Sequence, residues 1–80
     1  MTWKRAGKWD NSDGGYHILY EMAEDPRYTI TTHKYRSSDK WIVRYIGMYP
    51  DGRTREFPIL ARAKLDMEAH KRFTSLEVKR

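Results

Sequence analysis

Apolar and polar positions alternate along the middle of the chain, and this alternation predicts β-strands. Between Tyr16 and Met22 every second residue is aromatic, aliphatic or Met, which is typical of a strand with one buried face. Residues 28–35 and 41–49 are similarly rich in Thr, Tyr, Trp, Ile and Val, and residues 53–57 form a short return run. We therefore expect an antiparallel meander of three to four strands over residues 16–57.

The turns between these runs define a register in which the apolar faces agree. With Ser38-Asp39 as one loop and residues 50–52 as another, Thr32 lies opposite Tyr45, and Tyr45 lies opposite Phe57. A slip of one residue would move every apolar side chain of a strand to the other face, so this agreement supports the register. The predicted core face contains Tyr16, Ile18, Tyr20, Met22, Tyr28, Ile30, Trp41, Val43, Tyr45 and Phe57.

The periodicity changes after the last strand and predicts one helix over residues 58–74. Pro58 suits the first turn of a helix, and residues with high helix propensity follow it. Spacings of three and four give a buried stripe of Leu60, Ala63, Met67, His70 and Phe73. The expected fold is therefore α+β, with the helix packed on one face of the sheet.

The two ends of the chain give weaker patterns. Residues 1–15 are expected to form an N-terminal arm or a lid in which Trp3 or Trp9 folds over the core, and residues 75–80 a frayed tail. With 80 residues, the whole chain is expected to be a single small domain. No apolar run is long enough to span a membrane, and the absence of cysteine favours a reducing compartment such as the cytoplasm.

The charge distribution favours a polyanionic partner, although the same net charge of +5 would also serve solubility. Residues 27–55 carry seven Lys or Arg against two Asp, so the positive charge gathers on the predicted hairpins. Enzyme chemistry is not expected, because no nucleophile, phosphate-loop or paired-carboxylate pattern is present. His17, His33 and His70 lack the spacing of a metal site, so neither a metal nor another cofactor is expected.

Two segments of the hairpin read Lys40-Trp41-Ile42-Val43-Arg44-Tyr45 and Asp51-Gly52-Arg53-Thr54-Arg55-Glu56-Phe57, and Ala63-Lys64 follows in the helix. Over about half of the chain this pattern resembles the arm-type DNA-binding domains that open phage tyrosine integrases. The resemblance implies a three-stranded sheet backed by one helix, with the sheet entering the major groove of DNA.

A second pattern covers more of the chain and reads Trp3, Ser12-Asp13-Gly14-Gly15-Tyr16-His17-Ile18, Phe57-Pro58-Ile59-Leu60, Ala63-Lys64 and Glu68-Ala69-His70. It resembles short, mostly uncharacterised phage and prophage proteins, although Ile59 stands where that group tends to have a capping Thr. This resemblance implies a phage origin, and hence the cytoplasm of a bacterial host, but no activity.

Two functions follow from these patterns. The first is a small basic phage-type accessory protein that binds nucleic acid, with duplex DNA favoured, through its sheet. The side chains expected to contact nucleic acid are Arg44, Lys34, Arg36, Lys40, Arg53, Arg55, Thr31 and His33. The alternative is a module that docks on and modulates a host protein, or a weak homodimer formed through the sheet. Its contact strip would be Leu19, Tyr35, Ile42, Ile46 and Met48.

Overall fold

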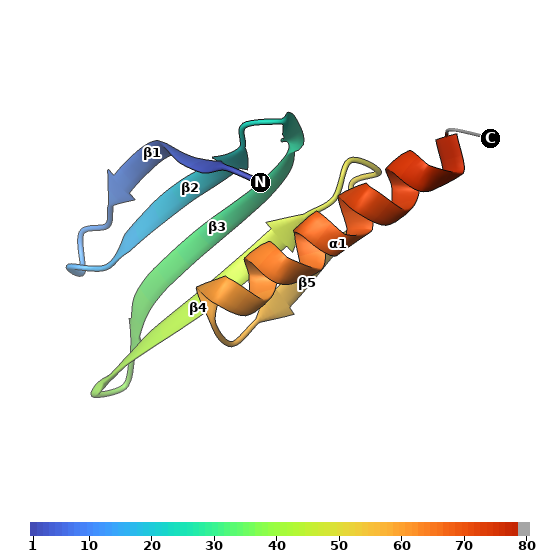
Figure 1. The fold of residues 1–80 in the computed structure, drawn as a ribbon. Coiled ribbons are helices and arrows are strands. Elements are labelled where there is room, and N and C mark those ends of the chain that lie inside the picture. Colours follow the sequence, from blue (N-terminus) through green and yellow to red (C-terminus); the bar gives the residue numbers. More distant parts are fainter. Residues whose placement is uncertain (79–80) are drawn as a thin grey trace.

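The computed structural model describes residues 1–78, with side chains to residue 74, as one twisted antiparallel sheet and one helix. The strands are β1 (Trp3–Asp10), β2 (Tyr16–Met22), β3 (Asp25–Ser37), β4 (Lys40–Met48) and β5 (Thr54–Phe57), and the helix is α1 (Leu60–Val78). The strands lie in the order β1-β2-β3-β4-β5, so the sheet is a simple meander (Figure 1). This confirms the α+β class and the antiparallel meander, but the sheet has five strands rather than three to four.

The register follows the one predicted from the turns. Thr32 pairs with Tyr45 and Tyr45 pairs with Phe57. The β3–β4 loop is the predicted two-residue turn, since Ser37 pairs with Lys40 and Ser38 has a φ of 57°.

The N-terminal residues form a strand, so the prediction of an arm or lid over residues 1–15 is wrong in that respect. β1 pairs with β2 along its length, with an irregularity between Arg5 and Gly7. Trp3 does reach the core, as the lid prediction proposed for one of the two tryptophans. Its indole Nε1 donates a 2.8 Å hydrogen bond to Glu68 of the helix, whereas Trp9 is 55% exposed.

Pro26 lies inside β3, although Pro has no backbone N–H to donate to a neighbouring strand. The register of β2 against β3 shifts between Glu21 and Met22, where Met22 pairs with Asp25. At a bulge one residue is left out of the hydrogen-bonded pairing between the strands, so its backbone N–H is not needed. This explains how the strand continues through a proline.

The helix begins and ends later than predicted. Its first backbone bond runs from the Ala63 amide to the Ile59 carbonyl at 3.3 Å, so Pro58 precedes the helix. Residues 75–78, predicted as part of a frayed tail, continue α1 to Val78. Lys79 and Arg80 lie outside the described residues.

The core occupies only one end of the sheet. Its buried residues are Met22, Tyr28, Ile30, Tyr49, Phe57, Ala63 and Met67. Trp41 and Val43, predicted as core, are 45% and 40% exposed, and Phe73, predicted on the buried stripe, is 69% exposed. These three side chains point where the sheet and the helix do not overlap.

The molecule is long and narrow, measuring 52 × 20 × 20 Å, because β3 and β4 run on past one end of the helix and the helix runs on past the other end of the sheet (Figure 1). α1 contacts β3, β4 and β5 (Figure 1). We call the sheet face that it touches the helix-side face, and the other the open face. On the helix-side face the helix leaves the end nearest the β3–β4 turn uncovered. Residues 35–42 extend beyond their pairing with β2 as a two-stranded segment, which we call the ribbon.

Candidate functional site

The eight side chains predicted to contact nucleic acid do not form one surface. The alternation of β3 and β4 separates them, because successive side chains of a strand point to opposite faces. Thr31, His33 and Arg44 lie on the open face. Arg55 lies on β5 beside the helix, and Arg53 directly precedes that strand. Lys34, Arg36 and Lys40 belong to the ribbon or its base.

The open-face group is held in a network with little free charge. Arg44 donates from Nε to the Tyr35 hydroxyl at 2.9 Å and from Nη1 to Glu56 at 2.6 Å. The hydrogen bond with Tyr35 and the charge of Glu56 raise the pKa of Arg44, so its cation is already partnered. Thr31 pairs with Ile46 in the row beside this network.

His33 adds little positive charge to the open face at neutral pH. It stacks on His17 with ring centroids 4.0 Å apart and lies 4.8 Å from the Tyr35 ring. Burial and the neighbouring His17 lower the pKa of His33, although the carboxylate of Asp13 opposes the shift. The neutral imidazole is therefore favoured.

Arg53 and Arg55 also have acidic partners. Arg53 binds Asp51 at 2.6 Å, and Arg55 lies 3.6 Å from Asp66. Asp66 also accepts a hydrogen bond from the hydroxyl of Tyr49, whose pKa burial raises to about 12. Arg55 and Tyr49 therefore join the sheet to the helix through Asp66, whereas Arg53 pairs within the β4–β5 loop. Two shallow hollows adjoin His70 and Asp66.

The ribbon group differs, because its cations have no acidic partner among the side chains of residues 1–74. The Lys34 Nζ lies 5.2 Å from the ring centroid of Trp41, and the Arg36 Cζ lies 5.9 Å from the same ring. Lys40 stands at the turn of the ribbon, opposite Ser37. Lys34 and Arg36 are thus held against an aromatic ring, and all three cations remain available to an anion.

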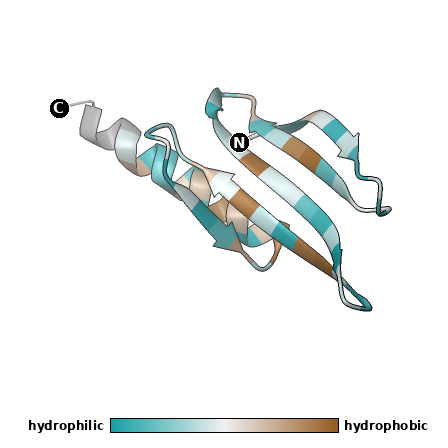
Figure 2. Cartoon of the chain, turned by 180° about the vertical axis from the view of Figure 1, so that it is seen from behind, coloured by the Kyte–Doolittle hydropathy of each residue, from teal (hydrophilic) through white to brown (hydrophobic). Residues whose placement is uncertain are grey.

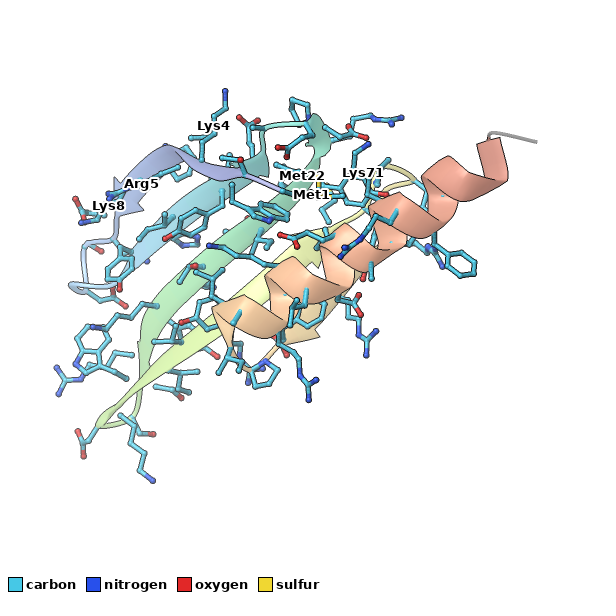
Figure 3. The ribbon with its side chains drawn as sticks, viewed as in Figure 1. Met1, Lys4, Arg5, Lys8, Met22 and Lys71 are labelled. Atoms are coloured by element: carbon cyan, nitrogen blue, oxygen red, sulfur yellow. The ribbon has the colours of Figure 1, made fainter. Side chains whose placement is uncertain are left out.

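Cations and rings alternate across four strands on the uncovered part of the helix-side face. The Lys34 Nζ also lies 5.5 Å from the ring centroid of Tyr16. The Lys8 Nζ lies 5.3 Å from the same Tyr16 centroid. We call the series the ladder; in order it contains Arg36, Trp41, Lys34, Tyr16 and Lys8. Figure 3 shows Lys8 on β1 at the end of the strand farthest from the helix.

Sequence reasoning placed Lys34 and Arg36 in the candidate site but missed the rings beside them. Tyr16 and Trp41 were assigned to the core, and Lys8 was not considered. Nothing in the sequence signalled this, because the strand was predicted over residues 28–35 only; the observed lengths explain the exposure. A helix rises about 1.5 Å per residue and a strand about 3.3 Å, so α1 spans about 28 Å and β3 about 43 Å. The helix therefore leaves part of the sheet bare.

The predicted protein-contact strip lies on the open face, but the row of His17, His33 and Arg44 divides it. Leu19, Thr31 and Ile46 form one cross-strand row, and Tyr35 pairs with Ile42 in another. Met48 is 46% exposed, whereas the other strip residues are half-buried. Figure 2 shows hydrophobic bands on β2 and β4 from this side. The strip remains a prediction.

Within the described residues, no group of three or more His, Cys, Asp or Glu side chains is placed to hold a metal ion. Across the same part of the chain, no helix is long and apolar enough to cross a membrane.

Comparison with known proteins adds no relative. No protein-family model matches the chain, and neither a curated protein nor a solved structure does. The two phage resemblances remain predictions.

Proposed function

We propose that the protein binds nucleic acid through its antiparallel sheet, by way of the ribbon and the ladder beside it. One observation carries the proposal. Lys34 and Arg36 lie against the same Trp41 ring, and Lys40 stands at the turn of the same ribbon. None of the three has an acidic partner among the described side chains, whereas Arg27, Arg44 and Arg53 are each paired with a carboxylate. Cations that are not neutralised internally retain their charge for phosphate groups.

The surroundings of Lys34 suit it to this role. Its ammonium lies between two rings, so part of the conformational freedom of the side chain is lost before a ligand arrives. Contacts between a cation and an exposed ring are worth only about 0.5–1 kcal/mol, so a phosphate oxygen can replace them. The two-stranded ribbon also has a shape that the major groove of duplex DNA admits.

The test is a fluorescence-anisotropy titration with a short labelled duplex and the corresponding single strand, at several salt concentrations. Binding should weaken steeply with salt, with a log–log slope of about −0.9 for each neutralised phosphate of a duplex. Arg36→Gln should weaken binding and reduce the steepness of that slope by about 0.9. The matched control is Arg72→Gln, because Arg72 is an exposed residue of α1 and its substitution changes the net charge equally.

The control separates a binding surface from a general charge effect. If Arg72→Gln weakened binding as much as Arg36→Gln, the affinity would reflect net charge and not the ribbon. If the protein bound neither probe at low salt, the proposal would be wrong. A pull-down of host proteins, with Ile46→Asp as the variant, would then test the open-face strip.

Arg44 has a smaller part here than the sequence-based hypothesis gave it. To read a base edge it would have to leave both Tyr35 and Glu56. Breaking two charge-assisted contacts costs free energy that a new base contact would have to recover. We therefore expect Arg44→Gln to weaken nucleic-acid binding less than Arg36→Gln.

A further inference from the structure

The ladder presents aromatic rings as well as charge, and a duplex would use only the charge. In a duplex the faces of the bases are stacked on one another, so a ring on the protein can reach only phosphates, sugars and groove edges. An unpaired base has a free face, and stacking it on an aromatic side chain contributes about 1–3 kcal/mol. Trp41 lies among the unpaired cations and is 45% exposed. The exposed part of its side chain does not contribute to packing in the ribbon.

The spacing of the rings indicates how a strand would lie. Tyr16 is on β2 and Trp41 is on β4, with Lys34 of β3 between them. Adjacent strands are about 4.8 Å apart, so the two rings are separated by roughly 10 Å across the sheet. Bases stacked in a helix are only about 3.4 Å apart. Neighbouring stacked bases cannot cover both rings, but the splayed bases of a flexible single strand can.

The charges fit the same arrangement. Lys34 lies between the rings, while Arg36 and Lys8 lie at the two ends of the ladder. Lys8 is 3.8 Å from Asp10, a pair whose side chains are 41% and 79% exposed, so solvent weakens that attraction. A phosphate between two splayed bases would meet Lys34, and the flanking phosphates would meet the outer cations.

We propose that the ladder is a binding site for single-stranded nucleic acid, in which one base stacks on Trp41, another stacks on Tyr16, and Lys34 binds the phosphate backbone between them. This inference rests on the proposed nucleic-acid function and specifies the class of ligand. The chemistry is common to DNA and RNA, because it uses base faces and phosphates and no contact that depends on the sugar.

The test compares two tryptophans of similar exposure on opposite faces. Trp41→Leu keeps apolar support for the stems of Lys34 and Arg36 but removes the ring, while Trp9→Leu makes the same change on the open face. The probes are a short mixed-sequence oligonucleotide, as DNA and as RNA, and the DNA duplex of the same sequence. Trp41→Leu should raise the dissociation constant for the single strand about 5- to 140-fold. It should change duplex binding much less, and Trp9→Leu should affect neither.

Tryptophan fluorescence gives a second measurement that a change in folding would not imitate. A base stacked on an indole quenches its emission, so titration with the single strand should quench the wild type and the Trp9→Phe variant. The quenching should be lost in Trp41→Phe, which keeps an aromatic ring for binding but removes the reporter. Preference for the single strand, as either DNA or RNA, together with these variant effects would support the inference.

Other results would separate the two proposals. If the wild type bound the duplex as tightly as the single strand, and Trp41→Leu affected both equally or neither, the stacking site would be wrong while nucleic-acid binding stood. If no probe bound at low salt, both proposals would fail.

Discussion

The docking of the helix depends on the missing side chain at Gly47. A Cβ added at this position would lie 3.1 Å from the Sδ of Met67 and 3.2 Å from the Cε2 of Phe57. Both distances are shorter than ordinary van der Waals contacts, so Gly47→Ala overpacks the interface between β4 and α1. Overpacking costs about 1–3 kcal/mol, and replacing a strand glycine regains about 0.5–1 kcal/mol, so we expect a net loss of about 1 kcal/mol.

Removing the side chain of Met67 should reverse the sign of this effect. Met67 is fully buried, so Met67→Ala should lower the free energy of unfolding by about 2–4 kcal/mol through lost burial and a cavity. In that background the methyl of Gly47→Ala enters the space that Met67 leaves. The double variant should therefore be more stable than the sum of the two changes predicts, by about 1–2 kcal/mol.

Urea unfolding followed by far-UV circular dichroism measures all four corners of this cycle. The control cycle pairs Gly47→Ala with Leu65→Ala, because Leu65 is on the same helix but 61% exposed, and that pair should be additive. Additivity within about 0.5 kcal/mol for the Gly47 and Met67 pair would show that the helix does not pack over this glycine in solution. The assignment of the covered and uncovered halves of the sheet would then have to be abandoned.

Three further predictions concern single contacts. The buried hydroxyl of Thr32 has no hydrogen-bond partner among the described residues, so Thr32→Val should raise the free energy of unfolding by about 1 kcal/mol in the same urea assay. Trp3→Phe should lower it by about 1 kcal/mol, and the effect should vanish in a Glu68→Ala background, because the indole donates to that carboxylate. The hydrogen bond from Arg27 lowers the pKa of Asp25 to about 2, so its stabilising contribution should be complete above about pH 4 and be lost as the pH falls toward 2. Thermal unfolding of Asp25→Asn should show a smaller change over that range; an equal change in wild type and variant would contradict the assignment.

The strand pattern and the turns of the chain contain most of the fold. The two-residue turn at Ser38-Asp39 and the loop at residues 50–52 each permit few registers, and the period of two then assigns every side chain to a face. This is why the pairing of Thr32 with Tyr45 could be predicted. The sequence of β1 was not recognised because Lys4, Arg5 and Lys8 give no apolar alternation along an edge strand.

Burial was harder to predict than register. Sharing a face with Ile30 does not bury Trp41, because burial also requires the helix to reach that position. Ile30 is fully buried beneath the helix, whereas Trp41 lies near the far end of β4. Sequence periodicity specifies the face of a side chain but not which part of that face another element covers. The sequence therefore predicted the cations Lys34 and Arg36 of the candidate site but not the aromatic rings of Tyr16 and Trp41.

The covered and uncovered halves of the helix-side face should respond differently to substitution. Residues in the core between the helix and the sheet, such as Met22 and Met67, are fully buried, and their loss would reduce stability and function together. The ladder contributes little to the core, since exposed contacts between cations and rings are worth about 0.5–1 kcal/mol each. Substitutions at Trp41 or Arg36 should therefore change the proposed binding while the fold remains intact. The proposed binding and the folding of the chain should be separable, because the ladder and the core lie on different halves of the same sheet face.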